Sequence, residues 1–93
     1  MQKENGVKST TNKLIEMLKE LFAGKYDAYR FSIDFPDYCF INYEKLEKEY
    51  SGLGVYLDQE VPDICDAGEP GFDSTKMITE LKKVYEKIIE IVA

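Results

Sequence analysis

The sequence predicts an all-α fold: a small antiparallel four-helix bundle with a kinked second helix. Apolar residues recur at helical spacing through most of the 93 residues, and no stretch keeps the period-two alternation of a half-buried strand. Gly and Pro fall at a few points between these periodic segments, so the connections between helices are short. Helices with short connections pack antiparallel to their neighbours, which predicts the bundle.

The first predicted helix begins near residues 9–11 and ends before Gly24. Ser and Thr hydroxyls at its start can cap free backbone N–H groups, and Gly24 suits the left-handed conformation that closes a helix. Residues 1–9 are polar, and we expect them to form a flexible N-terminal arm. Residues 10–93 then form a single helical bundle domain. The apolar stripe of this first helix comprises Leu14, Ile15, Leu18, Leu21 and Phe22.

The second predicted helix begins after Asp27, which can cap it, and runs to about Tyr50. Pro36 lies inside its apolar pattern. Because Pro lacks a backbone donor and clashes with the preceding turn, we expect a kink or break near residues 34–36. The pattern resumes beyond this point and ends before Gly52.

The third predicted helix spans about residues 53–65. Gly54 near its start weakens it by about 1 kcal/mol relative to Ala, and Pro62 is expected to kink it or to separate its last turn. A loop with Gly and Pro follows over residues 66–73. The last predicted helix begins at residue 73 or 74 and runs to about residue 92. Its broad apolar stripe comprises Met77, Ile78, Leu81, Val84, Tyr85, Ile88, Ile89 and Val92.

Charge is distributed unevenly along the chain, whose net charge is −6. From Asp27 to Asp73 there are twelve carboxylates and three cationic side chains, whereas the two ends are rich in lysine. Phosphate binding needs clustered Lys and Arg, so this segment argues against direct binding of nucleic acid and of anionic membranes. It favours a basic partner, and it would speed association with one. The alternative is that the acidity only keeps the protein soluble.

The residues required for common catalytic and metal sites are missing. Without any histidine, the chain lacks the usual general base near neutral pH, the His-activated nucleophiles and most zinc sites. Glu60, Asp63 and Asp66 are three residues apart, but di-metal centres in helical bundles use inward Glu-x-x-His motifs. We therefore predict no enzymatic activity, no cofactor and no metal site.

Cys39 and Cys65 are expected to be buried free thiols. No signal peptide or membrane span is evident, so we expect a cytoplasmic protein.

The segment from Val55 to Pro70 carries the candidate binding surface. Its apolar residues keep helical spacing, so one face can dock on a core while carboxylates occupy the other, and the segment has no Lys or Arg. Tyr56 combines an apolar ring with a polar tip, which suits an interface anchor, and a ring that only completes the core is an equal alternative. The predicted partner-binding residues are Tyr56, Asp58, Glu60, Asp63, Asp66 and Glu69, with Asp34 and Asp37 beside Pro36 as second choices.

Three stretches in this order resemble bacterial immunity proteins of the colicin D immunity type: L-I-x-x-L-K-x-L-F-A-G-K-Y over residues 14–26, F-x-x-D-F-P-D-Y over 31–38, and L-D-Q-E-V-P-D-I-C-D over 57–66, with G-E-P following. The resemblance covers most of the chain beyond the N-terminal arm and rests on order, length and acidity. It implies a helical bundle that neutralises a cognate nuclease toxin of the tRNase type. In that family the inhibitor covers the basic substrate cleft of the toxin with acidic side chains.

Two alternatives come from other classes of protein. One is a non-catalytic adaptor or regulatory module that buries an apolar groove against a partner helix, and its binding would be insensitive to salt. The other is a carboxylate-dependent enzyme or metal carrier, which a metal analysis of the purified protein would test. The identity and reaction of the toxin and the oligomeric state do not follow from the sequence.

Overall fold

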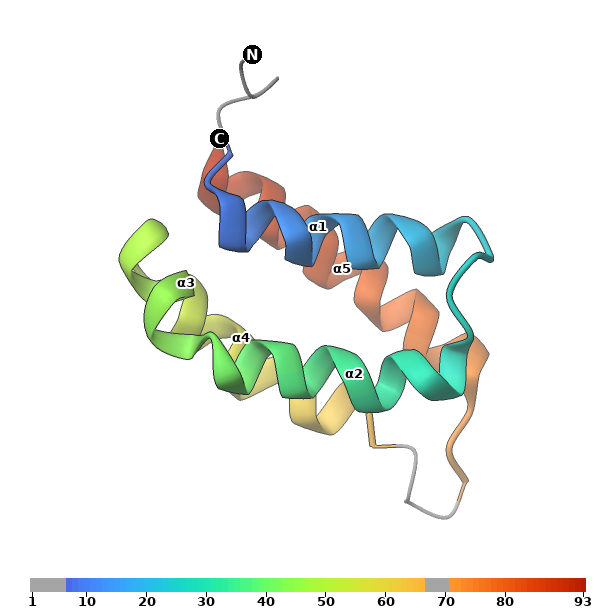
Figure 1. The fold of residues 1–93 in the computed structure, drawn as a ribbon. Helices are drawn as coiled ribbons and strands as arrows, with labels where there is room; N and C mark the ends of the chain where they lie inside the picture. Colours follow the sequence, from blue (N-terminus) through green and yellow to red (C-terminus); the bar gives the residue numbers. More distant parts are fainter. Residues whose placement is uncertain (1–6, 67–70) are drawn as a thin grey trace.

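The computed structural model describes residues 7–66 and 71–93. In these two ranges the regular elements are five α-helices and no β-strand, so the all-α prediction is confirmed. The helices are α1 Ser9–Phe22, α2 Ala28–Ile41, α3 Tyr43–Glu49, α4 Leu53–Ile64 and α5 Ser74–Val92. In Figure 1, α1 lies beside α5, α2 lies in front of α4, and α3 closes one end of the bundle.

The core receives buried side chains from every helix. The predicted apolar stripes of the first and last helices supply much of it, because their i, i+3 and i+4 positions face inward. Cys39 and Cys65 are buried and unpaired, as predicted. Burial raises the pKa of both thiols, that of Cys65 to about 12. The largest fully buried side chains are Phe31, Phe35, Leu14, Leu18, Leu46, Leu53, Leu57, Met77, Leu81 and Ile88.

The predicted second helix is divided into two helices, which raises the number in the described ranges from four to five. The helix continues through Pro36, since the fixed φ of proline is helical and its missing N–H removes one hydrogen bond. The division falls at Asn42, whose backbone N–H and side-chain amide both donate to the Tyr38 carbonyl oxygen, at 3.0 and 2.9 Å. Pro62 likewise lies inside α4, which continues to Ile64. Neither proline breaks its helix, so that part of the prediction is wrong, while a kink at either proline stays a prediction.

The N-terminus of α1 is capped by a distant carboxylate and not by its own hydroxyl groups. Glu49, the last residue of α3, accepts hydrogen bonds from the backbone N–H groups of Thr10 and Thr11, at 3.1 and 2.9 Å. The Thr11 hydroxyl also donates to Glu49, at 2.7 Å. Before α1, Val7 is buried and the Lys8 N–H donates to the Tyr50 hydroxyl, so both residues contact the bundle. The rest of the predicted arm, residues 1–6, lies outside the described residues.

Replacing Glu49 with Gln is expected to destabilise the fold by about 1–2 kcal/mol at neutral pH, the usual effect of losing a helix cap. Burial of Glu49 opposes its ionisation, but the hydrogen bonds from Thr11 and Thr10 outweigh burial and hold the pKa of Glu49 below its ordinary value of 4.5. This stabilisation is present above pH 4.5 and is lost as the pH falls through the lowered folded-state pKa. Urea unfolding over a series of acidic pH values measures the effect.

The control for this experiment is Glu86→Gln, at an exposed position on α5 that has no ion pair among the described residues. The control variant is expected to keep the acid sensitivity of the wild type, whereas Glu49→Gln flattens it. Identical pH profiles for Glu49→Gln and the wild type would contradict the assigned cap.

Gly54 allows α3 and α4 to approach closely. A Cβ atom at this position would lie 2.9 Å from the backbone carbonyl oxygen of Tyr43 and 3.1 Å from the Cβ of Glu47. The opposing atom at the shorter distance belongs to the backbone of α3, so a larger residue would push the two helices apart. Gly54 lowers helix propensity, but it permits a close approach of α3 and α4 that the sequence does not reveal.

Candidate functional site

The exposed side of α4 carries the predicted carboxylates. Leu57 and Val61 point into the core, which turns Asp58, Glu60 and Asp63 toward solvent. Asp66 follows the helix and is also exposed. None of these four carboxylates forms an ion pair with a described residue. They are therefore available to an external cation, whereas Glu69 lies outside the described residues.

The structure divides these carboxylates among different sides of α4. Residues two apart on an α-helix lie about 160° apart around its axis, so Asp58 and Glu60 flank the exposed side at opposite edges. Asp58 lies toward α2, where it lines grooves with Phe40. Glu60 lies toward Tyr56 and the end of α5. The pKa of Tyr56 is raised, first by burial and then by the negative charges of Glu60 and Glu90.

Asp63 and Asp66 are brought together at the far end of α4. They line one pocket of about 510 Å³ with Phe72, which precedes α5. Lys76 lines the same pocket, yet no ion pair joins it to either carboxylate. Asp63 and Asp66 are thus two predicted partner-binding carboxylates that share one pocket.

Tyr56 is half-buried and packs against the hydrophobic core. The ring therefore contributes to the fold whether or not its remaining exposed edge contacts a partner. Tyr56 lies near Glu60, so an aromatic surface and a carboxylate are neighbours here.

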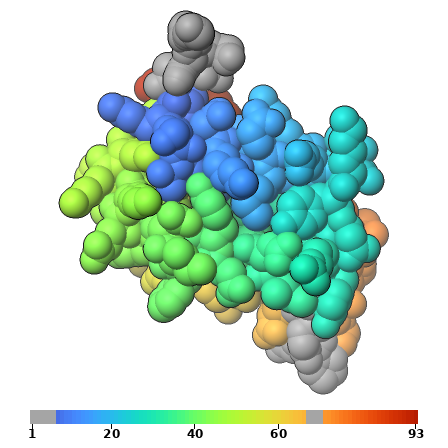
Figure 2. Space-filling model, in the orientation of Figure 1, coloured from blue at the N-terminus to red at the C-terminus, as the bar shows by residue number. Residues whose placement is uncertain are grey.

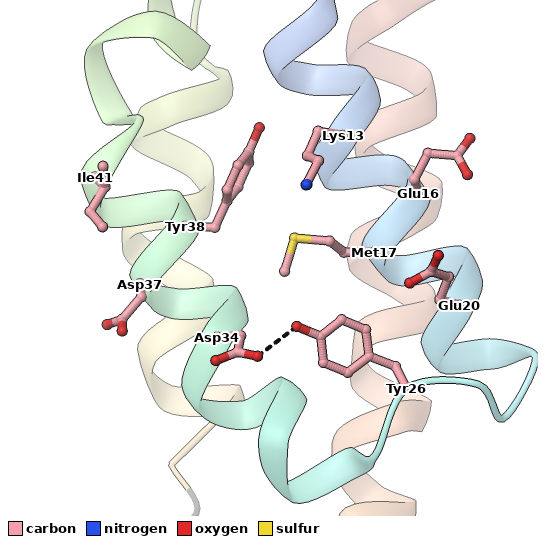
Figure 3. A pocket seen from close by; sticks show the side chains of 9 residues that line it. All are labelled: Lys13, Glu16, Met17, Glu20, Tyr26, Asp34, Asp37, Tyr38 and Ile41. Atoms are coloured by element: carbon pink, nitrogen blue, oxygen red, sulfur yellow. Dashed lines mark hydrogen bonds between the residues drawn. The ribbon is translucent and has the colours of Figure 1, made fainter.

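The second-choice residues Asp34 and Asp37 line a groove of about 440 Å³ between α1 and α2. Figure 3 shows Glu16 and Glu20 on the α1 side of this groove, opposite Asp34 and Asp37 on α2. Sequence reasoning did not select the two glutamates as site residues. The available signal was their i, i+4 spacing beside the apolar stripe of the first helix.

Asp34 is less available than the other candidates because it has internal partners. The Tyr26 hydroxyl donates to Asp34 Oδ2 at 2.7 Å, and Arg30 Nε lies 3.6 Å from the same oxygen (Figure 3 shows the Tyr26 contact). Burial, and then the hydrogen bond to Asp34, raise the pKa of Tyr26 to about 12. Asp37 is exposed and forms no ion pair with any residue that the structure describes, so it is the stronger of the two candidates.

Several large apolar residues on α2 face solvent, which sequence reasoning missed. Phe40 is 79% exposed and Ile41 76% exposed, and Tyr29 and Ile33 are exposed as well. Figure 2 views the molecule from the side on which α2 lies in front, with its surface in teal to green. Exposed apolar residues that gather on one element are typical of an interaction surface.

Metal-ligating side chains do not gather anywhere in the described ranges: no group of three or more Cys, Asp or Glu there could hold a metal ion. Among the same residues, no helix combines the length and the apolarity that crossing a bilayer requires.

Comparison with known proteins gives no further assignment. No family model matches the chain, and neither the curated proteins nor the solved structures contain a significant match.

Proposed function

We propose that this chain is an inhibitor of the bacterial immunity type: a small antiparallel bundle that binds a cognate basic nuclease toxin, of the tRNase type, in the cytoplasm. The observation that carries the proposal is the pair Asp63 and Asp66, which line one pocket at the end of α4, with Asp58 and Glu60 at the two edges of the exposed part of this helix. All four carboxylates are exposed and form no ion pair with a described residue. The resemblance to colicin D immunity proteins supports the same reading. The inhibitor itself performs no chemistry.

The physical basis is competition for cationic side chains. A ribonuclease cleft presents Lys and Arg that contact phosphates of the RNA. Carboxylates on a folded helix can accept charge-assisted hydrogen bonds from these groups in place of the phosphates. Because these carboxylates form no ion pairs with described residues, binding does not require such pairs to be broken. The net charge of −6 attracts a basic domain at long range and accelerates capture.

A non-catalytic adaptor is the second candidate, and the exposed apolar residues of α2 favour it. An adaptor would use this surface in an interface with little charge, so its affinity would change little with ionic strength. An inhibitor that covers a basic cleft would bind more weakly as salt increases.

The test identifies the partner and then asks whether the chain neutralises it. The intact chain is used as bait in an extract of the bacterium that encodes it, at low and at high salt. We expect it to retain a basic domain that degrades tRNA and arrests growth when expressed alone, and coexpression of this chain should restore growth and intact tRNA. A retained partner that is harmless, or one whose affinity is insensitive to salt, would contradict the proposal and favour the adaptor.

A further inference from the structure

Helix α2 carries two apolar seams on different sides. The inner seam consists of Phe31, Phe35 and Cys39, which are buried at i, i+4 and i+8. The outer seam consists of Tyr29, Ile33, Pro36 and Phe40, separated by four, three and four positions. This 4-3-4 spacing is the repeat by which one helix contacts another along a heptad seam. The inner seam supplies the buried hydrophobic residues of α2.

Three of the four outer-seam residues, Tyr29, Ile33 and Phe40, are exposed, whereas Pro36 is half-buried and lines a groove with α4. Tyr29 is 60% exposed and Phe40 79% exposed. Only two further large hydrophobic residues of the described ranges are exposed outside α2, namely Val55 on α4 and Ile89 on α5. Concentration of the exposed apolar surface on a single helix indicates a docking face and not a random surface composition.

Carboxylates border this face on both sides. Between α2 and α4, a groove of about 200 Å³ runs past Phe40 and Pro62, with Asp37 and Asp58 on its rim and no Lys or Arg among its described lining residues. On the other side, the groove between α1 and α2 has four carboxylates and a single cation, Lys13. Two further cations lie nearby: Lys45 lines a third groove with Asp58, and Arg30 on α2 lies 3.6 Å from Asp34. Carboxylates outnumber cations among the groove residues, so the docking face is apolar along its centre and mainly acidic at its edges.

We propose that the outer seam of α2 holds an amphipathic, basic helix of the partner protein. Apolar side chains of that helix pack on Ile33 and Phe40, and its flanking Lys and Arg residues pair with Asp37 and Asp58. The inference deepens the proposed function and rests on it, because it names the part of the basic partner that the chain contacts.

A second copy of this chain fits the same face poorly. Its own α2 would bring another set of carboxylates against Asp37 and Asp58, and both copies carry a net charge of −6. Like charges placed opposite one another across an interface disfavour association. Charge complementarity thus selects a basic helix over self-association.

The test uses a defined probe, a synthetic helical peptide with Leu at heptad positions a and d and Lys at e and g. We expect saturable binding by fluorescence anisotropy, weakening as salt increases. The matched peptide with Glu in place of Lys should not bind. The double variant Ile33→Gln/Phe40→Gln should weaken binding of the Lys peptide by about tenfold or more. Ile89→Gln, an exposed apolar residue on α5, is the control and should bind as the wild type does.

Equal affinity of the wild type and the Ile33→Gln/Phe40→Gln variant for the Lys peptide, or no saturable binding, would overturn the docking inference. The inference would also be overturned if the wild-type chain sedimented as a dimer and the Ile33→Gln/Phe40→Gln variant as a monomer. The occupant of the docking face would then be a second copy of the chain. These outcomes leave the toxin-neutralisation test untouched. Conversely, peptide docking that depends on Phe40, combined with a harmless captured partner, would refute the inhibitor and retain the docking face.

Discussion

Replacing Phe35 with Ala is expected to lower the free energy of unfolding by about 3–5 kcal/mol. The Phe35 ring is fully buried and stacks on Phe31, with ring centroids 4.6 Å apart and an interplanar angle of 17°. Its removal leaves a cavity in the core, on the inner side of α2. Since a domain of this size is stable by about 5–15 kcal/mol, the variant should lose a large part of its stability. Urea unfolding followed by circular dichroism measures the loss.

Phe40→Ala, on the same helix, is the matched control. Phe40 is 79% exposed, so its removal should change the free energy of unfolding by no more than about 0.5 kcal/mol. The same Phe→Ala substitution should therefore have a large effect on stability in the inner seam and a small effect in the outer seam of α2. Similar losses for the two variants would show that Phe40 belongs to the core and would remove the basis for the docking face.

Hydrophobic periodicity predicts the long helices of this chain well. The stripes of the first and last predicted helices match α1 and α5. Asp27 and Asp73 cap α2 and α5 by accepting hydrogen bonds from the backbone N–H groups of Arg30 and Thr75, both at 2.9 Å. These features depend on residues within one or two turns, so the local sequence contains the information. The same stripes supply part of the core, although Ile89 of the last stripe is 39% exposed and Met17, outside the first stripe, is buried.

Features that join distant parts of the chain are not predictable in this way. Glu49 caps α1 from 38 residues away, and Gly54 is needed because of a carbonyl on the neighbouring helix. The predicted second helix divides at Asn42, whose side chain joins its backbone N–H in donating to the Tyr38 carbonyl oxygen, whereas Pro36 is tolerated within α2. Residue spacing alone shows none of these features.

The candidate site is predictable in its residues but not in its shape. Helical spacing placed the carboxylates of residues 58–66 on the side away from the core, and the structure has them exposed. Spacing did not show that Asp58 faces α2 while Asp63 and Asp66 share a pocket near α5. Residue spacing also did not reveal the outer seam. Helix α2 is apolar on two sides, and the assumption of one apolar stripe per helix places all its aromatic rings in the core.

Reversing the charge of both Asp63 and Asp66 to Lys is expected to weaken binding of the captured toxin domain by about a hundredfold, or about 2.8 kcal/mol. Each substitution replaces an attraction to a cationic side chain with a repulsion, in a surface pocket that holds the two carboxylates together. The loss should appear in the association rate as well as the dissociation rate, and it should shrink as salt increases. Titration calorimetry and stopped-flow kinetics measure these quantities.

Thermal stability should hardly change in this double variant, because neither carboxylate forms an ion pair with a described residue. The reversal also reduces the repulsion that accompanies a net charge of −6. Single reversals provide the matched comparison: Asp63→Lys on α4 against Glu86→Lys on α5, which make the same change in net charge. If the site is local, Asp63→Lys weakens binding by about tenfold, whereas Glu86→Lys changes it by less than about threefold through long-range charge alone. Equal effects of the two variants would mean that the partner senses only the total charge, and α4 would then have no special role in recognition.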